Sequence, residues 1–356
     1  MFDKDTSSKF TKILKNERIF LFGGAGFIGH NLALHLRKLT KNVFVVDNLM
    51  TNNLIDNLFS KDSETSKFNF YRKILMQRFR LLRENDVKMI NADTRNYSDL
   101  SVIFEQYKPT KVIHLSAISS AIKARQNPSL CFDIQLISLK NLLELCRLRL
   151  KKVNQFTFLS SSTVYGDFET EEVNENTRPR PRGIYANTKY MGERLVRTYC
   201  HQYGLGTTII RPSALYGERC ISKRVSQIFI ENALEKKISK LEGGGDGLLD
   251  FTYIDDLVQG IIRSLVYHEG HNTSQTFNIT FGKARNIKEL FDIVKLNIPE
   301  SKSINAERVL DKPIRGTLSI DRAKKVLKFK PVWPLEKGYV KYIKWFKNIW
   351  MKNNLH

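Results

Sequence analysis

Tyr185 and Lys189 stand four positions apart in a segment that holds few helix breakers after Gly183. On a helix this spacing places both side chains on one face, with their Cβ atoms roughly 5–6 Å apart. An ammonium group beside a phenol stabilises the phenolate, which lowers a tyrosine pKa from about 10 toward neutrality. The phenolate is then a general base for a hydroxyl proton. Because Tyr-x-x-x-Lys also occurs by chance in many helices, the surrounding motifs decide its meaning.

A glycine-rich loop near the N-terminus indicates a dinucleotide site. Residues 18–22 have the composition of a short buried strand, and residues 31–39 have the apolar spacing of a helix. Between them, Gly23, Gly26 and Gly29 form a G-x-x-G-x-x-G loop. Glycines at these positions allow a tight turn and a close approach of the backbone to a pyrophosphate, which the helix N-terminus attracts.

Acidic residues end two further strand-like runs. Asp47 ends the run after the first helix, where a carboxylate binds the free 2′-hydroxyl of a ribose and repels a 2′-phosphate, so this position favours NAD over NADP. Asp93, followed by Thr94, ends another run and is suited to the adenine amine. Residues 111–117 form a further buried strand, in which we expect His114 to be a core histidine rather than a catalyst.

A serine-rich segment supplies a hydroxyl partner for the phenol. Residues 155–166 have the pattern of a strand that opens into a run of serines, and Ser161 lies 24 positions before Tyr185. The carboxyl ends of parallel strands share one edge of a sheet, and open α/β sheets bind their ligands there. We therefore expect Ser161 and Tyr185 to meet at this edge.

With these features the chain resembles the extended short-chain dehydrogenase/reductases, in the NAD-dependent nucleotide-sugar epimerase/dehydratase family, from about residue 18 to about residue 346. Within that family it is most similar to UDP-sugar and UDP-uronate 4-epimerases. The motifs that carry the resemblance are the glycine loop, Asp47-Asn-Leu, Val112-Ile-His-Leu-Ser-Ala, Ser160-Ser-Ser-Thr-Val-Tyr-Gly, Tyr185-x-x-x-Lys189, Arg211-Pro-Ser-Ala-Leu-Tyr-Gly, Asp250-Phe-Thr-Tyr-Ile-Asp-Asp256, Phe277-Asn-Ile and Arg315-Gly-Thr-Leu-Ser-Ile-Asp-Arg-Ala-Lys. The resemblance implies an α/β fold with a doubly wound parallel sheet and a smaller C-terminal substrate-binding cap. It also implies NAD as the cofactor, a nucleotide-diphosphate sugar as the substrate, and a homodimer.

The resemblance also implies the site residues. The implied catalytic residues are Tyr185, Lys189 and Ser161. The implied cofactor contacts are Gly23, Gly26, Phe27, Ile28, Gly29, Asp47, Asn48, Asp93, Thr94, Leu115, Ala117, Tyr185, Lys189 and Pro212. The implied substrate contacts are Ser119, Ser161, Ser162, Arg219 and Arg315. No metal is expected.

The implied reaction is inversion at a sugar C4 atom. Tyr185 takes the C4 hydroxyl proton while NAD accepts the C4 hydride, and return of the hydride to the other face of the 4-keto sugar inverts the carbon. Family 4,6-dehydratases carry Asp-Glu directly after the hydroxyl residue, whereas this chain has Ser162 and Thr163. We therefore expect a 4-epimerase that makes precursors of cell-surface polysaccharides. A 4-keto reductase, a C4 oxidase, a decarboxylase and a 4,6-dehydratase are the alternatives within the family.

Three positions depart from the family pattern. Ala214 replaces an asparagine that contacts the substrate diphosphate, and Leu249 replaces an arginine that binds phosphate. Gln135 replaces another asparagine. These changes leave the redox chemistry intact and the identity of the nucleotide open.

Composition agrees with an α/β enzyme of this size. The chain has 356 residues, of which 42% are hydrophobic, so it can form a large core. We expect a polar tail at residues 1–17, a dinucleotide-binding domain at 18–212, and a cap at 213–356, with part of 250–282 crossing back to the large domain. No signal peptide or membrane span is expected. The four cysteines show neither metal nor paired spacing, which favours a reducing cytoplasm.

The net charge of +22 raises the alternative of a nucleic-acid-binding protein. Lys and Arg are spread along the chain rather than gathered at one place, so we expect no nucleic-acid partner. The densest basic stretch, residues 71–83, has the pattern of an amphipathic helix with its arginines in solvent. The competing class of function is a non-catalytic NAD-bound scaffold, or an RNA-binding protein that uses its basic surface.

Overall fold

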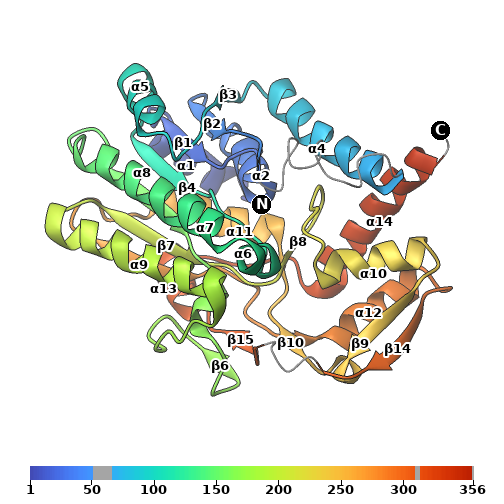
Figure 1. The fold of residues 1–356 in the computed structure, drawn as a ribbon. Helices are drawn as coiled ribbons and strands as arrows, with labels where there is room; N and C mark the ends of the chain where they lie inside the picture. The colour runs from blue at the N-terminus through green and yellow to red at the C-terminus, as the bar shows by residue number, and fades with distance from the viewer. Residues whose placement is uncertain (51–65, 309–312, 355–356) are drawn as a thin grey trace.

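A seven-stranded sheet forms the centre of the larger domain (Figure 1). The computed structural model describes residues 1–50, 66–308 and 313–354. The strands of this sheet are β1 (Ile19–Phe22), β2 (Val43–Asp47), β3 (Lys88–Asn91), β4 (Lys111–His114), β5 (Gln155–Leu159), β7 (Thr207–Arg211) and β12 (Ser274–Asn278). Their order is β12-β7-β5-β4-β1-β2-β3, and every neighbouring pair is parallel. The chain winds outward from β1 in both directions, which confirms the doubly wound α/β fold.

Helices cover both faces of this sheet (Figure 1). They are α1 (Lys4–Leu14), α2 (Phe27–Leu36), α5 (Tyr97–Tyr107), α6 (Ala121–Gln126), α7 (Pro128–Phe132), the π-helical turn η1 (Asp133–Ile137), α8 (Ser138–Arg147), α9 (Gly183–Tyr203), α11 (Ile254–Val266) and α13 (Asp321–Leu327). Side chains alternate along a strand. Ile19 and Leu21 of β1 therefore face the α2 and α11 layer, and Phe20 and Phe22 face the α5, α8 and α9 layer.

The C-terminal part of the chain builds a smaller cap. It contains α10 (Val225–Leu234), α12 (Ile287–Asn297) and α14 (Leu335–Asn354), with the parallel pair β9 (Ile238–Glu242) and β14 (Lys302–Ala306). The remaining short elements are β6 (Glu172–Val173), β8 (Leu215–Tyr216), β10 (Leu248–Leu249), β11 (Thr252–Tyr253), β13 (Arg285–Asn286), β15 (Thr317–Leu318), η2 (Ser162–Tyr165) and η3 (Gly243–Gly245). The segment between the cap elements returns to the large domain, because α11 packs on α2 and β12 pairs with β7.

The basic stretch is a helix, as its pattern predicts, but one of its arginines is buried. Helix α4 (Ser66–Glu84) contacts α2, and the ring of Phe70 packs against Phe346 of α14. The side chain of Arg80 is 66% exposed. Arg78, by contrast, is 1% exposed. The prediction that these arginines lie in solvent is therefore wrong for Arg78, because its side chain points into the junction of α4, α2 and the cap.

The expected polar tail is also helical. Asp3 caps α1 by accepting a hydrogen bond from the Thr6 amide at 2.7 Å. Phe10 and Leu14 of this helix are fully buried, and the Phe10 ring contacts the ring of Tyr267 with centroids 6.1 Å apart. The prediction of a tail at residues 1–17 is wrong for this helix, because its few apolar residues fall on one face and join the core.

None of the helices in the described residues has the length and apolar composition that a membrane crossing requires.

Candidate active site

A cavity of about 490 Å³ lies where the carboxyl ends of the central strands face the cap. The glycine loop, the ends of β2, β4 and β5, the start of α9 and the loop before α10 line it. Of the residues that the sequence assigns to the site, all except Arg219 line this cavity. Segments far apart in the chain therefore meet at the edge of the sheet where ligands of such folds bind.

The glycine loop has the shape of a phosphate cradle. Gly23 has a φ of +78°, and a Cβ atom at this position would lie 2.6 Å from the backbone nitrogen of Ser116. A Cβ on Gly29 would overlap the backbone of Gly24, so the helix could not approach the loop as closely. Gly26 is the N-cap of α2 and supplies no side-chain cap. The first amides of α2 are thus left for an anion, as a dinucleotide diphosphate requires.

Carboxylates mark the adenosine end of the cavity. Asp47 accepts hydrogen bonds from two backbone amides at 3.0 and 2.8 Å, while burial raises its pKa. Asn48 donates to Asp93 at 3.0 Å. The hydrogen bond from Arg95 lowers the pKa of Asp93, so this carboxylate stays ionised at neutral pH. These residues line the cavity, and their contacts with the ribose and adenine of NAD stay a prediction.

The phenol and the serine hydroxyl meet at the other end. Ser161 and Tyr185 line the same cavity, and the Ser161 hydroxyl acts to lower the pKa of the phenol. Burial raises the pKa of Tyr185, and the positive charge of Arg224 acts in the opposite direction. The Arg224 guanidinium donates to the Ser119 carbonyl at 3.0 Å, which holds its charge at the mouth of the cavity. The sequence motif did not indicate Arg224, which belongs to the cap.

Lys189 lies one helical turn beyond Tyr185 on α9 and is buried. Its ammonium donates to the Leu159 carbonyl at 2.7 Å and lies 5.1 Å from the centre of the Phe158 ring. Burial lowers the pKa of Lys189 to about 8. The expectation that Lys189 lowers the Tyr185 pKa is therefore wrong for this structure, because burial raises that pKa and Lys189 is held against the end of β5, so that the opposing charge comes from Arg224.

A buried ion pair fixes the position of α9 at the strand ends. Glu193 accepts hydrogen bonds from Arg211 at 2.8 and 2.7 Å, and from the Ser160 hydroxyl at 2.6 Å. Arg211 also donates to the Tyr165 hydroxyl at 2.9 Å. Helix α9 is thus tied to β5 and β7 one turn beyond Lys189, which fixes the distance between the phenol and the serine run.

Polar groups surround the space next to Tyr185. Arg315 donates to the Ser162 carbonyl at 2.9 Å, and burial lowers its pKa to about 10. The Thr163 hydroxyl is buried and finds no hydrogen-bond partner in residues 1–50, 66–308 and 313–354. Ser119, Ser162 and Pro212 also line this part of the cavity. A sugar with several hydroxyls and an anionic diphosphate would satisfy these groups.

Comparison with known proteins agrees with this geometry. Residues 19–280 match the model of the NAD dependent epimerase/dehydratase family. This chain belongs to that family. It is 30% identical to a Methanocaldococcus jannaschii protein assigned as a UDP-glucose 4-epimerase, across 93% of this chain and 98% of that protein. It is 28% identical to the dTDP-glucose 4,6-dehydratase of Salmonella typhimurium, across 94% of this chain and 95% of the enzyme.

The fold is also that of a solved epimerase. The structure of the Bacillus cereus UDP-glucuronic acid 4-epimerase, in complex with UDP-glucuronic acid and NAD, superposes with a TM-score of 0.80 at 24% identity. The match covers 93% of this chain and 99% of the other. It confirms the fold expected from the sequence, and the family match confirms an NAD-dependent enzyme.

The structure places Arg219 of this epimerase/dehydratase away from the expected substrate site. Its side chain donates to His30 at 2.9 Å and to Asn31 at 2.7 Å, both on α2. It does not line the cavity. The Arg219 guanidinium thus holds the cap loop to α2 instead of facing the cavity, and substrate binding by Arg219 stays a prediction.

Two further arginines of the cavity, Arg78 and Arg95, were not foreseen from the motifs. A signal for Arg78 exists in the sequence, since it lies three and four positions after Leu75 and Ile74, which are buried on the same helix face. Arg95 follows Asp93 closely and binds it, but nothing in the sequence distinguishes it from other surface arginines.

His114 is fully buried and contacts Ser138 at 2.9 Å, and burial lowers its pKa to about 3, which confirms a core histidine.

Proposed function

We propose that this family member is a UDP-sugar 4-epimerase that inverts C4 through a transient 4-keto sugar. One observation carries the proposal: the Tyr185 phenol and the Ser161 hydroxyl line the same cavity as a glycine loop shaped like a phosphate cradle. A sugar nucleotide in this cavity would bring a single sugar carbon to the phenol and to the nicotinamide. The choice of UDP follows the relatives, among which UDP-sugar 4-epimerases recur.

Each residue then has a defined task. Tyr185 takes the proton from the C4 hydroxyl and later returns it. Ser161 bonds the same oxygen and keeps it in line with the phenol. Lys189 binds the nicotinamide ribose. Its ammonium group stabilises the Tyr185 phenolate once that group has turned away from the Leu159 carbonyl. NAD supplies the hydride acceptor, and the amides of α2 with Asp47 would hold it.

The distribution of carboxylates argues against a 4,6-dehydratase. Elimination of water from C5 and C6 needs an acid and a base near the sugar. Among the described residues that line the cavity, the carboxylates are Asp47 and Asp93, and both lie at the adenosine end. Beside the phenol stand Ser162 and Thr163, which have no acidic group.

A panel of sugar nucleotides tests the proposal directly. The protein is incubated with UDP-glucose, UDP-N-acetylglucosamine, UDP-glucuronate and dTDP-glucose, and the C4 configuration is followed by proton NMR. Interconversion of C4 epimers without net NADH is the expected result. Accumulation of NADH would indicate a C4 oxidase instead of an epimerase. Loss of carbon dioxide would indicate a decarboxylase, and a 6-deoxy-4-keto product would indicate a 4,6-dehydratase.

Replacing Tyr185 by Phe separates chemistry from cofactor binding. We expect turnover to fall by at least about 100-fold, because the general base is lost. Bound NAD should remain at the wild-type level. Tyr190→Phe, on the same helix but outside the cavity lining, is the matched control and should keep its activity. Full activity of the Tyr185 variant would instead favour a scaffold function.

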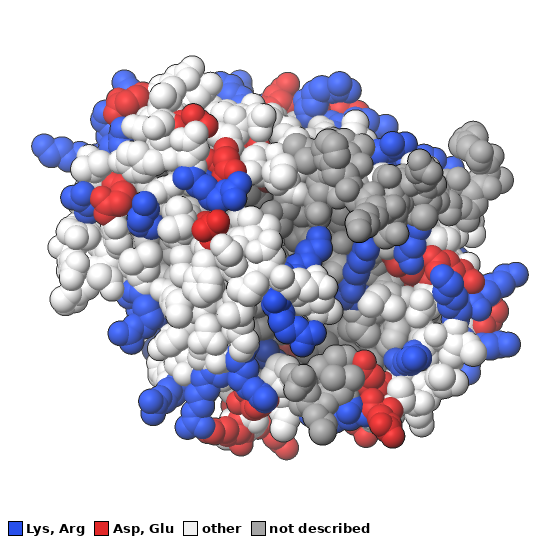
Figure 2. Space-filling model, in the orientation of Figure 1, with Lys and Arg blue, Asp and Glu red and all other residues white. Residues whose placement is uncertain are grey.

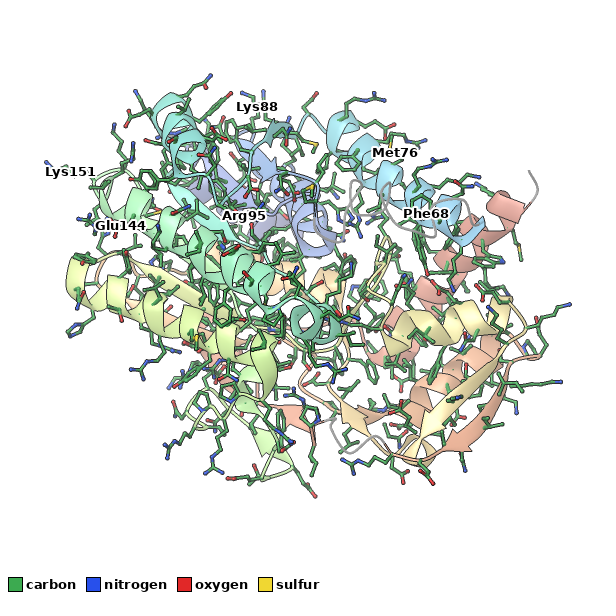
Figure 3. All side chains as sticks on the ribbon, viewed as in Figure 1. Phe68, Met76, Lys88, Arg95, Glu144 and Lys151 are labelled. Atoms are coloured by element: carbon green, nitrogen blue, oxygen red, sulfur yellow. The ribbon has the colours of Figure 1, made fainter. Side chains whose placement is uncertain are left out.

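We propose a homodimer formed through α8 and α9. These helices contact each other, and exposed apolar side chains lie on both, among them Leu148 after α8 and Met191 and Tyr203 on α9. Met191→Glu should shift the protein from dimer to monomer in light scattering. Met76→Glu, on the outward side of α4 (Figure 3), is the control and should leave the mass unchanged.

We also propose that the enzyme works in the cytoplasm, on precursors of cell-surface polysaccharides, without a nucleic-acid partner. Free buried cysteines support a reducing compartment. On the face shown in Figure 2, Lys and Arg are interspersed with Asp and Glu rather than gathered in one stripe. RNA affinity that falls steeply with salt would contradict this part of the proposal.

A further inference from the structure

The helix α4 carries a buried cation that the proposed chemistry leaves without a task. The Arg78 Nε and Nη2 atoms donate to the Arg219 carbonyl at 3.1 and 2.6 Å. Its Nη1 atom is buried and has no hydrogen-bond partner among the residues that the structure describes. Within the described part of the chain, no carboxylate forms an ion pair with it. One nitrogen of the guanidinium therefore lacks a hydrogen-bond acceptor among the described residues.

The surroundings make this charge unfavourable in the absence of an anion. Burial lowers the pKa of Arg78 to about 10, and the neighbouring Arg219 guanidinium acts in the same direction. The negative charge of Asp47 compensates in part. A buried charge without a hydrogen-bonded counterion is strongly destabilising, so a site of this kind favours an anionic ligand.

The position of Arg78 indicates which anion it meets. It lines the same cavity as Phe27 and Ile28, in the first turn of α2. Its charge also lowers the pKa of His30, which lies in the next turn of that helix. The N-terminus of α2 has no side-chain cap and attracts phosphate. Two positive features, the helix N-terminus and the guanidinium, thus face one part of the cavity.

We infer that Arg78 would bind the diphosphate of NAD through Nη1, together with the amides of α2. The inference rests on the NAD dependence of the family and not on the identity of the sugar. Asp47 lies close enough to influence Arg78 and would repel a 2′-phosphate, so the diphosphate is the group that fits.

The guanidinium is held in place before the ligand arrives. Arg219 presents its carbonyl to Arg78 while its own side chain is bound to α2. Tyr71 of α4 donates to Glu231 of α10 at 2.7 Å, so the helix also rests on the cap. Such preorganisation reduces the entropy lost on binding. Arg219 is accordingly a positioning residue for Arg78, and α4 covers the cofactor.

Binding of small adenine ligands tests the inference without any sugar substrate. Apo protein carrying Arg78→Met is titrated calorimetrically with ADP and with adenosine, and the NAD that co-purifies is quantified. We expect the affinity for ADP to fall about 10- to 100-fold, as for a lost charged hydrogen bond. The affinity for adenosine should stay within about twofold, since adenosine has no phosphate. Arg80→Met, exposed on the same helix, should bind both ligands as the wild type does.

Several outcomes would overturn the inference. ADP affinity within about twofold of the wild type would exclude a phosphate contact, and an equal loss for adenosine would assign Arg78 to packing. A loss confined to 2′,5′-ADP would place the guanidinium at the ribose 2′-position instead. If Arg78→Met does not fold by circular dichroism, Arg78→Lys replaces it. Lysine keeps the charge but lacks the planar, two-pronged donor arrangement of a guanidinium, so the affinity for ADP should fall about 3- to 10-fold. A smaller loss of affinity would likewise reject the phosphate contact. Failure of epimerase activity would not affect any of these measurements.

Discussion

Replacing Glu193 by Gln should destabilise the protein strongly, because it breaks a fully buried ion pair. Glu193 and Arg211 are 0% and 1% exposed, and two hydrogen bonds join them. Glutamine keeps the shape of the side chain but leaves the Arg211 charge without a counterion. Loss of one partner from such a pair costs about 3–5 kcal/mol of unfolding free energy.

This cost converts into a shift of the melting temperature. The entropy of a globular protein rises by about 2.1 cal/mol/K per residue on unfolding. For a chain of 356 residues the unfolding entropy is therefore roughly 0.75 kcal/mol/K. A loss of 3–5 kcal/mol therefore lowers the Tm by about 4–7 °C. The same change frees α9 from β7, so we also expect lower activity at temperatures where the variant is still folded.

The pH dependence provides a second check on the same pair. Burial alone would raise the pKa of Glu193, but the hydrogen bonds and charge of Arg211 outweigh it, so the folded-state pKa lies below the ordinary value. A carboxylate of this kind stabilises the fold at pH values above its unfolded pKa of about 4.3, and loses this effect as the pH falls through its folded pKa. The Tm difference between wild type and variant should thus be full at pH 7 and shrink below about pH 4.

The assay is thermal unfolding followed by circular dichroism at pH 7 and at two acidic pH values. Glu84→Gln is the matched control, because Glu84 pairs with Arg80 on the surface of α4, where an i,i+4 pair contributes about 0.3–0.5 kcal/mol. A Tm loss for the Glu193 variant no larger than that of the control would refute the reasoning. So would a difference that does not change with pH.

Two further predictions concern the site. Arg224→Met removes the charge that lowers the Tyr185 pKa, so the acidic limb of the kcat/KM profile should move to higher pH, by up to about 0.7 units for an exposed charge. Lys223→Met, outside the cavity lining, should leave the profile in place, and an unmoved limb in both variants would contradict the assignment. Gly23→Ala should lose co-purified NAD, because its Cβ would enter the facing backbone, whereas Gly270→Ala, also at positive φ but with no atom near its Cβ, should retain it. Equal NAD content in the two alanine variants would show that the glycine cradle is not needed.

Local patterns were sufficient for the nucleotide half of the site. Gly23 and Asp47 act through the backbone geometry of one strand-turn-helix unit, which a short stretch of sequence specifies. The spacing of Tyr185 and Lys189 likewise follows from the period of a single helix. The place of Ser161 was predicted because parallel strands end at a common edge.

The electrostatics of the site could not be obtained in this way. The cation that acts on Tyr185 comes from Arg224 in the cap, and the orientation of Lys189 depends on a carbonyl at the end of another strand. Arg219 was assigned to the substrate from its place in the sequence, yet it binds α2. A pKa and a hydrogen-bond partner depend on burial and on all nearby charges, and these are set by packing between distant segments.

By itself, then, the sequence determined the fold class, the glycine loop and the placing of Tyr185 and Lys189 on one helix, because each is encoded by a short periodic or spaced pattern. Only the tertiary structure decided that α1 joins the core and that the Arg78 side chain of α4 lines the cavity. An amphipathic helix shows which residues share a face, but the chain that packs on that face decides whether a charge there meets water or a ligand.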